Sequence, residues 1–297
     1  MVVNGVALMN ARRLKQMVAA LLLLMTAGNA AAQPAEKLYT LQVGDAVMTV
    51  NAEGGGKILS FKYKEQEVIS QSRWPESFGS TFWTSPQKEW NWPPVPEFDK
   101  RPYTVEQESP TLVMTSEVSE RLKFRIRKEF ATDPSDSAFV ITYSIINEGD
   151  VARKVAPWEI TRVPNEGTIF LDAPVDSITP AGLMPFEEVN GIACYIADEA
   201  AQNRKVNADG KGWLAYANKG LLLVKTFQDL DSSQPAPGEA EIQVYVNRGK
   251  TYIELESQGA YTELKPGEGL SWTVRWYLAP HTGEVLPAVR RFLSVCQ

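Results

Sequence analysis

The chain has 297 residues, of which 44% are hydrophobic, and it carries 36 acidic against 30 basic residues for a net charge of -6. This composition is typical of a folded globular protein and excludes a disordered chain or a fibrous repeat. Because the charge is acidic and basic residues form no dense run, nucleic acid is not expected as a partner.

The first part of the chain has the pattern of an export signal. Three basic residues within 12–15 precede an apolar run at 17–25, and small residues follow at 30–32. An anchoring helix is the alternative, but the apolar run is much shorter than the roughly 20 residues that span a bilayer. We therefore expect a signal peptide at 1–32 and a mature protein that is periplasmic or secreted, with no membrane span. The remainder, 33–297, is expected to form one domain.

From Leu38 onward the sequence has the pattern of antiparallel β-structure. Segments rich in Val, Ile, Thr, Phe and Tyr alternate with polar residues at a period of two, and turn residues separate them. The clearest strands are expected at 112–118, 122–130, 139–146, 221–227, 241–246, 251–256 and 270–278. Helical spacing of apolar residues is clear only at 285–295. The sequence thus predicts an all-β sandwich of antiparallel strands with a short C-terminal helix.

Two stretches, 71–102 and 174–211, resist assignment as strands and are expected to be long loops, which often carry function. The first contains four of the eight tryptophans and six prolines, which stiffen the chain. Rigid indoles favour sugar binding because the C–H face of a pyranose stacks on them, although the same rings could cap the core instead. We assign ligand-binding roles to Trp83, Trp90 and Trp92.

Three segments resemble the galactose-mutarotase-like superfamily, which includes the aldose 1-epimerases. They are an Asn-containing turn and following strand at 143–161, a Trp-rich loop at 79–94, and the last strands at 264–277. The similarity spans 38–280 and is greatest to an uncharacterised bacterial family within that superfamily. It implies a β-supersandwich of antiparallel strands that binds an aldose-like ligand on its open face.

The resemblance also implies a reaction, in which a base acts at the anomeric hydroxyl and an acid at the ring oxygen. In active epimerases a histidine supplies the acid. The corresponding stretch here, 156–159, contains no histidine, and His281, the only histidine in the chain, follows the last strand. This departure leaves carboxylates and cations as the candidate catalytic groups.

The strand that follows the Asn-containing turn carries two of these candidates. Glu159 interrupts an otherwise apolar strand next to Trp158, which suggests a charged partner, either Arg162 or Lys225. The alternative is a buried salt bridge without a role in the site. We assign catalytic roles to Glu159 and Arg162, and ligand-binding roles to Trp158 and Lys225.

A second strand carries Glu254 and Glu256, which share one face because they are two residues apart, with roughly 7 Å between them along the strand. This spacing suits paired acid–base work, and it equally fits two solvated glutamates. We assign a catalytic role to Glu256.

Together these features favour an exported carbohydrate-binding protein whose ligand is an aldose, a uronate or an oligosaccharide. Two alternatives stay open: a non-catalytic periplasmic protein-interaction module, and an aldose epimerase or sugar lyase that uses a carboxylate base and an arginine. No cofactor or metal is expected, because no Cys and His spacing fits a zinc site and two nearby acids do not make a calcium site. Whether Cys194 and Cys296 form a disulfide is left open.

Overall fold

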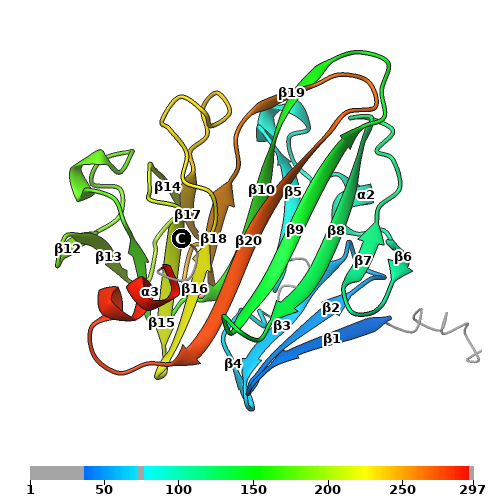
Figure 1. Cartoon of the computed structure of the whole chain (residues 1–297). Helices are drawn as coiled ribbons and strands as arrows, with labels where there is room; N and C mark the ends of the chain where they lie inside the picture. The colour runs from blue at the N-terminus through cyan, green and yellow to red at the C-terminus, as the bar shows by residue number, and fades with distance from the viewer. Residues whose placement is uncertain (1–36, 73–76, 294–297) are drawn as a thin grey trace, which may run out of the picture. The chain divides into compact units, whose positions relative to one another are not determined.

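Two antiparallel sheets dominate the structure, a computed structural model that describes residues 37–72 and 77–293 (Figure 1). The described residues belong to one compact unit that begins at Lys37. The expected signal peptide lies outside the described residues, as do Trp74 and Cys296.

Sheet A carries the candidate site. Its strands are β1 (Leu38–Val43), β2 (Ala46–Asn51), β3 (Lys57–Tyr63), β4 (Gln66–Glu67), β5 (Ser80–Ser85), β10 (Arg153–Pro164), β14 (Arg204–Ala208), β17 (Ile242–Val246), β18 (Tyr252–Gln258) and β19 (Thr262–Leu264). Their order is β1-β2-β3-β5-β10-β18-β17-β14, with β4 paired to β3 and β19 paired to β10. Neighbouring strands of this sheet thus come from distant parts of the chain.

Sheet B packs against sheet A. Its strands are β6 (Thr104–Gln107), β7 (Leu112–Thr115), β8 (Phe124–Asp133), β9 (Ala138–Asn147), β11 (Thr168–Leu171), β12 (Glu187–Val189), β13 (Ile192–Ile196), β15 (Trp213–Asn218), β16 (Leu221–Thr226) and β20 (Gly269–Pro280). Their order is β12-β13-β11-β15-β16-β20-β9-β8-β7-β6. The described helices are the short helices η1 (Gln87–Glu89), α2 (Pro96–Asp99) and η2 (Val175–Ser177), and the C-terminal α3 (Val285–Leu293).

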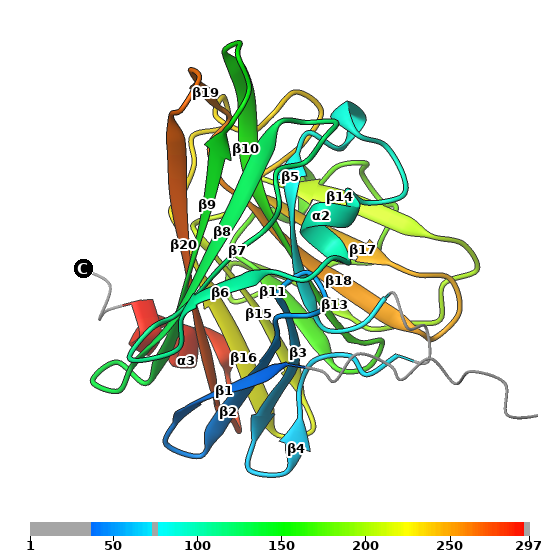
Figure 2. The same ribbon diagram turned by 90° about the vertical axis from the view of Figure 1, so that its right-hand side faces the viewer.

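The main core lies between the two sheets, and Figure 2 shows the ribbon of both sheets turned by 90° from the first view. Strand β8 illustrates how the sequence builds it, because Phe124, Ile126 and Phe130 alternate with less buried residues and all face inward. A smaller cluster lies where α3 covers sheet B. There the ring of Phe292 stacks on that of Tyr277 with 4.6 Å between their centroids. The predicted all-β sandwich with a short C-terminal helix is confirmed.

The prediction of two long loops is wrong in part, because both stretches contain strands. The stretch 71–102 contains β5, a strand inside sheet A, and 174–211 contains β12, β13 and β14. Strand β5 escaped the pattern because all six of its residues are buried, so apolar and polar residues do not alternate along it. Its polar side chains bond inside the protein instead, as Ser80 does with Thr161 at 2.9 Å.

A lysine is buried in the core beside two glycines. Lys128 of β8 is 1% exposed, and its Nζ donates hydrogen bonds to the carbonyl oxygens of Gly55 at 2.7 Å and Gly56 at 3.2 Å. Among the described residues it has no salt bridge to a carboxylate. Burial lowers its pKa from 10.5 to about 7, although Asp99 acts in the opposite direction.

This pKa predicts a pH dependence of stability. Between pH 7 and 10.5 the unfolded chain binds a proton on Lys128 that the folded protein has released, so the free energy of unfolding rises with pH over this range. The Lys128→Met variant should show a smaller rise when urea unfolding is measured from pH 7 to 9. Equal slopes for the two proteins would contradict the lowered pKa.

Candidate functional site

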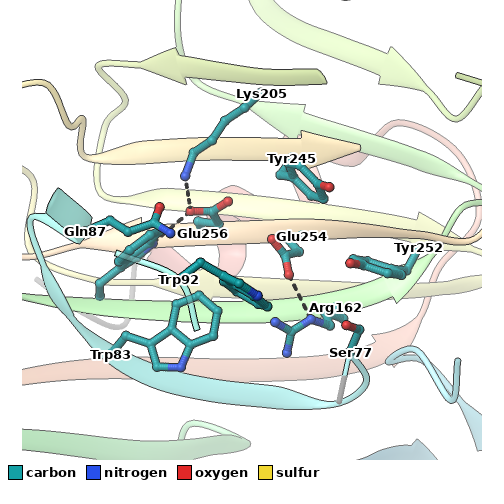
Figure 3. A pocket seen from close by; sticks show the side chains of 11 residues that line it. Ser77, Trp83, Gln87, Trp92, Arg162, Lys205, Tyr245, Tyr252, Glu254 and Glu256 are labelled. Carbon is teal, nitrogen blue, oxygen red and sulfur yellow. Dashed lines mark hydrogen bonds and ion pairs between the residues drawn. The ribbon is translucent and has the colours of Figure 1, made fainter. Parts of the chain in front are cut away.

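One face of sheet A contains a pocket of about 320 Å³. The residues that line it come from the chain just before β5, from β5, from η1 and the loop after it, and from β10, β14, β17 and β18 (Figure 3). They are Ser77, Trp83, Gln87, Trp92, Trp158, Arg162, Lys205, Tyr245, Tyr252, Glu254 and Glu256. The pocket is therefore assembled across strands and not from one loop.

Strand pairing explains why these side chains meet. Arg162 of β10 lies opposite Glu254 of β18, Glu254 lies opposite Tyr245 of β17, and Tyr245 lies opposite Lys205 of β14. Directly paired residues in a sheet point to the same face, so the four side chains form one row across the sheet. The predicted shared face of Glu254 and Glu256 is present, since both line the pocket.

Two ion pairs lie at the base of the pocket. Arg162 donates from Nε to Glu254 Oε1 at 2.8 Å, and Lys205 donates from Nζ to Glu256 Oε2 at 2.9 Å. Trp158 also donates from Nε1 to Glu256 Oε2, at 2.8 Å. The charges of the described lining residues cancel, because two cations face two carboxylates. The site thus presents donors and acceptors without a net formal charge.

Arg162 keeps a donor free in this arrangement. Its side chain is only 2% exposed, and Nη1 has no hydrogen-bond partner among the described residues. Its guanidinium also lies over the Trp83 ring, 5.7 Å from the centroid. A buried donor without a partner costs on the order of 1–3 kcal/mol. A ligand that supplies an acceptor in the pocket would remove that cost.

Burial shifts the pKa of three side chains that line the pocket. Burial raises the pKa of Glu256 above its ordinary 4.5, against the opposing effect of Lys205. Burial likewise raises the pKa of Tyr245 and of Tyr252 above 10, so both phenols are protonated at neutral pH and can donate hydrogen bonds.

Indole rings form one wall of the pocket. Trp83 contacts Trp158 edge to face at 5.5 Å and Trp92 at 6.2 Å between ring centroids. The fourth ring of this cluster, Trp90, is 1% exposed and packs behind Trp83 at 5.5 Å, outside the pocket lining. Of the four tryptophans that were assigned ligand-binding roles, Trp83, Trp92 and Trp158 therefore line the pocket, and Trp90 packs behind this wall.

A buried carboxylate holds the Trp83 ring. Asp99 of α2 accepts hydrogen bonds at Oδ1 from Trp83 Nε1 and from Thr81 Oγ1, both at 2.9 Å. Lys57 pairs with the other oxygen, Oδ2, at 3.1 Å. Burial acts to raise the pKa of Asp99, but the Lys57 charge and these hydrogen bonds together lower it below 3.8. Asp99 thus stays ionised and fixes the indole.

Glu159 and Lys225 do not reach the pocket, and their predicted site roles do not agree with their positions. Glu159 follows Trp158 on β10, so it points to the opposite face of the sheet, into the core. There its Oε2 pairs with Lys225 Nζ at 2.5 Å, and Tyr143 and Trp276 donate to its Oε1 at 2.8 and 3.1 Å. Burial lowers the pKa of Lys225, against the effect of Glu159.

Glu159 forms a buried salt bridge with Lys225, which is the alternative that the sequence analysis gave to a role in the site. Both side chains have no exposed surface. Such a pair influences stability and not ligand contact. The charged residue in an apolar strand, Glu159, therefore belongs to an ion pair of the core and does not line the pocket.

The sequence analysis missed five pocket residues: Ser77, Gln87, Lys205, Tyr245 and Tyr252. Lys205 belongs to a stretch expected to be a loop, and its position depends on the pairing of β14 with β17. Tyr245 lies in an expected strand, but only the pairing with β18 shows that it faces Glu254. Pairing of distant strands has no local sequence signal.

Some kinds of site are not found in the described part of the chain. No three His, Cys, Asp or Glu side chains there come together as possible metal ligands. The described helices include none with the length and apolarity needed to cross a membrane. His281 lies outside the pocket lining, and its Nε2 is 3.0 Å from the carbonyl oxygen of Gly283.

Comparison with known proteins gives similarity in fold. No family model matches the sequence, and no curated protein is significantly similar to it. A candidate aldose 1-epimerase from Escherichia coli K12 matches 82% of this chain and 99% of its own, with a TM-score of 0.60 at 14% identity. A galactose mutarotase-like protein from Lactobacillus casei matches 82% and 100%, with a TM-score of 0.58 at 12% identity.

A galactose mutarotase related enzyme from Lactobacillus acidophilus is also similar, with a TM-score of 0.55 at 11% identity over 83% of this chain and 99% of its own. These matches, together with the two antiparallel sheets, show that the chain has the galactose-mutarotase-like fold. The resemblance stated from the sequence is confirmed at the level of the fold. At such low identity the fold carries no residue roles from these proteins to this one.

Proposed function

We propose that the protein binds a carbohydrate in the pocket of sheet A. The observation that carries the proposal is the free Nη1 donor of buried Arg162 next to the indole wall. A pyranose has apolar C–H faces that stack on indole and hydroxyls that both donate and accept hydrogen bonds. Glu254 and Glu256 offer acceptors within the same pocket, so both kinds of contact are supplied.

The balance of charge favours a neutral sugar over a uronate. Each carboxylate in the pocket is paired with one cation, so an added carboxylate would meet Glu254 and Glu256 without an unpaired positive charge. In a partly dehydrated pocket such a like charge is unfavourable. A neutral aldose or a neutral oligosaccharide is thus the ligand class that we propose.

We also propose that binding takes place after export, in the periplasm or outside the cell. The support is the basic and apolar pattern within 12–32, which is typical of a signal peptide. Detection of a mature chain that starts near residue 33 in a periplasmic or culture fraction would test this. A full-length chain in the cytoplasmic fraction alone would contradict it.

Tryptophan fluorescence provides the direct test of the sugar site. Trp92 and Trp158 line the pocket, so a ligand that contacts them changes their emission. We expect a saturable change with one or more neutral sugars and a weaker one with the matching uronates. No change across a panel of neutral sugars and uronates would contradict the site and favour a surface for protein contacts.

Catalysis of aldose epimerisation is a second candidate, favoured by one observation: two carboxylates share the pocket, and burial raises the pKa of one, Glu256. A protonated Glu256 would give its proton to the ring oxygen while Glu254 accepts the proton of the anomeric hydroxyl, which opens the ring. The reverse transfers on the other carbonyl face close it as the other anomer. The pocket lining contains no histidine for the acid role.

The variant Glu256→Gln tests this candidate. If the wild-type protein interconverts anomers faster than buffer in NMR, Glu256→Gln should reduce the rate by about 10²- to 10⁴-fold, because the proton donor is lost. The wild-type rate should fall as pH rises through the raised pKa of Glu256 and the carboxyl loses its proton. Glu129→Gln, on β8 outside the pocket, is the control. A wild-type rate equal to that of buffer would remove epimerisation.

A further inference from the structure

Trp92 differs from the other described tryptophans in its exposure. It is 65% exposed, whereas Trp83, Trp90 and Trp158 of the same cluster are 5%, 1% and 2% exposed. Exposed apolar surface costs about 25 cal/mol per Å² relative to burial, and an indole is one of the largest apolar side chains. The ring that is left in solvent lies at the lining of the pocket and not elsewhere on the surface.

The chain just before Trp92 is anchored at Glu89 and Trp90. Trp90 is buried and donates from Nε1 to the carbonyl oxygen of Thr84 at 2.8 Å. The guanidinium of Arg121 also donates hydrogen bonds to the carbonyl oxygens of Trp90 and Glu89. The ring of Trp92 itself rests with its edge against Trp83, at 80° between the ring planes. Because the ring is already held, a ligand that stacks on it loses little entropy in ordering it.

The polar groups of the pocket begin beside this ring with Arg162 of β10 and continue across β18 to Lys205 of β14. In Figure 3 Trp83 and Trp92 lie on one side, and Lys205 and Tyr245 lie on the other, with the two carboxylates of β18 between them. Arg162 offers one free donor, and the two glutamates offer acceptors, to the hydroxyls of one sugar ring. A volume of about 320 Å³ lies at the lower end of the range of about 300–1,000 Å³ that is typical of pockets for drug-sized ligands.

We infer that Trp92 forms a second subsite, and that the ligand is a neutral oligosaccharide of at least two residues. Its terminal ring contacts Arg162, Glu254 and Glu256, and its next ring stacks on the exposed face of Trp92. This inference rests on the proposed carbohydrate function and adds the length of the ligand and its direction, from the strands of sheet A outward past the loop after η1.

Calorimetric titration with mono- and disaccharides tests the inference. The probes are glucose and galactose, and the disaccharides maltose, cellobiose and lactose. We expect at least one disaccharide to bind the wild-type protein about tenfold more tightly than its component monosaccharides, as one stacked ring would give. Trp92→Ala should abolish this advantage, because it weakens disaccharide binding more than monosaccharide binding, while Trp92→Phe keeps part of the advantage.

The control variant is Ile196→Ala, which removes a 67% exposed apolar side chain of β13 outside the pocket. It should change neither affinity. Monosaccharide binding without a disaccharide advantage, or an equal loss of both affinities in Trp92→Ala, would overturn the second subsite and leave the proposed function intact. If no sugar binds the folded wild-type protein, the proposed function fails and this inference fails with it.

Discussion

The Lys225→Met variant is expected to lose about 3–5 kcal/mol of unfolding free energy, because it leaves Glu159 in the core without its cation. Tyr143 and Trp276 still donate to Oε1 of Glu159, but neither carries a positive charge. Urea unfolding at neutral pH measures the loss. If Lys225→Met is too unstable to purify, the double variant Glu159→Gln/Lys225→Met should be recoverable, because it removes both charges and keeps the acceptor.

Two controls separate a core role from a site role. Lys265→Met removes one partner of an exposed ion pair, in which the side chain of Lys265 is 73% exposed and that of Glu268 is 51% exposed. It should change the free energy of unfolding by less than about 1 kcal/mol. Sugar affinity of the folded double variant should equal that of the wild-type protein, since both side chains lie on the core side of sheet A. A double variant that folds but no longer binds the ligand would contradict this separation.

Replacement of Arg162 by lysine should reduce sugar affinity by about 10- to 100-fold. Lysine keeps the positive charge next to Glu254 but cannot present Nε to that carboxylate and Nη1 to a ligand at the same time. A hydrogen bond from a charged donor is worth about 1.5–3 kcal/mol, which corresponds to this range of affinity. Fluorescence titration of Arg162→Lys with the sugar that binds the wild-type protein measures the change.

The matched control for Arg162→Lys is Arg125→Lys. Arg125 forms an ion pair with Glu148, and each of these two side chains is about one third exposed. It has the same chemistry and lies outside the pocket, so affinity should not change. Circular dichroism shows whether each variant is folded. An Arg162→Lys protein that is folded and binds as tightly as the wild-type protein would show that Nη1 does not contact the ligand.

The parts of the fold that were predictable are those with a local signal. In β8 one face is buried and the other is less so, which places Phe124, Ile126 and Phe130 at even spacings along the sequence. The helix α3 covers one face of sheet B and keeps its amphipathic spacing. Strand β5 is buried on both faces and has no such alternation, which is why Trp83 was placed in a loop.

The candidate site was predictable only in part, for a different physical reason. The shared face of Glu254 and Glu256 follows from their spacing along one strand. Whether that face or its opposite lines a pocket depends on how the sheets pack. For Glu159 the sequence left a site role and a core salt bridge equally open, and the choice depended on Lys225, more than sixty residues away in the chain.

The position of β14 connects occupancy of the pocket to local unfolding. This strand is an edge strand of sheet A. Among the described strands it pairs along its length with β17 alone, and one isolated bridge joins Asn207 to Thr179. Lys205, the cation that balances Glu256, belongs to it. Local unfolding of this edge strand moves Lys205 away from Glu256 and disrupts the row of side chains that begins at Arg162. Any molecule held by that row therefore protects this edge strand from amide hydrogen exchange by RT ln(1 + L/Kd), where L is the concentration of the free ligand.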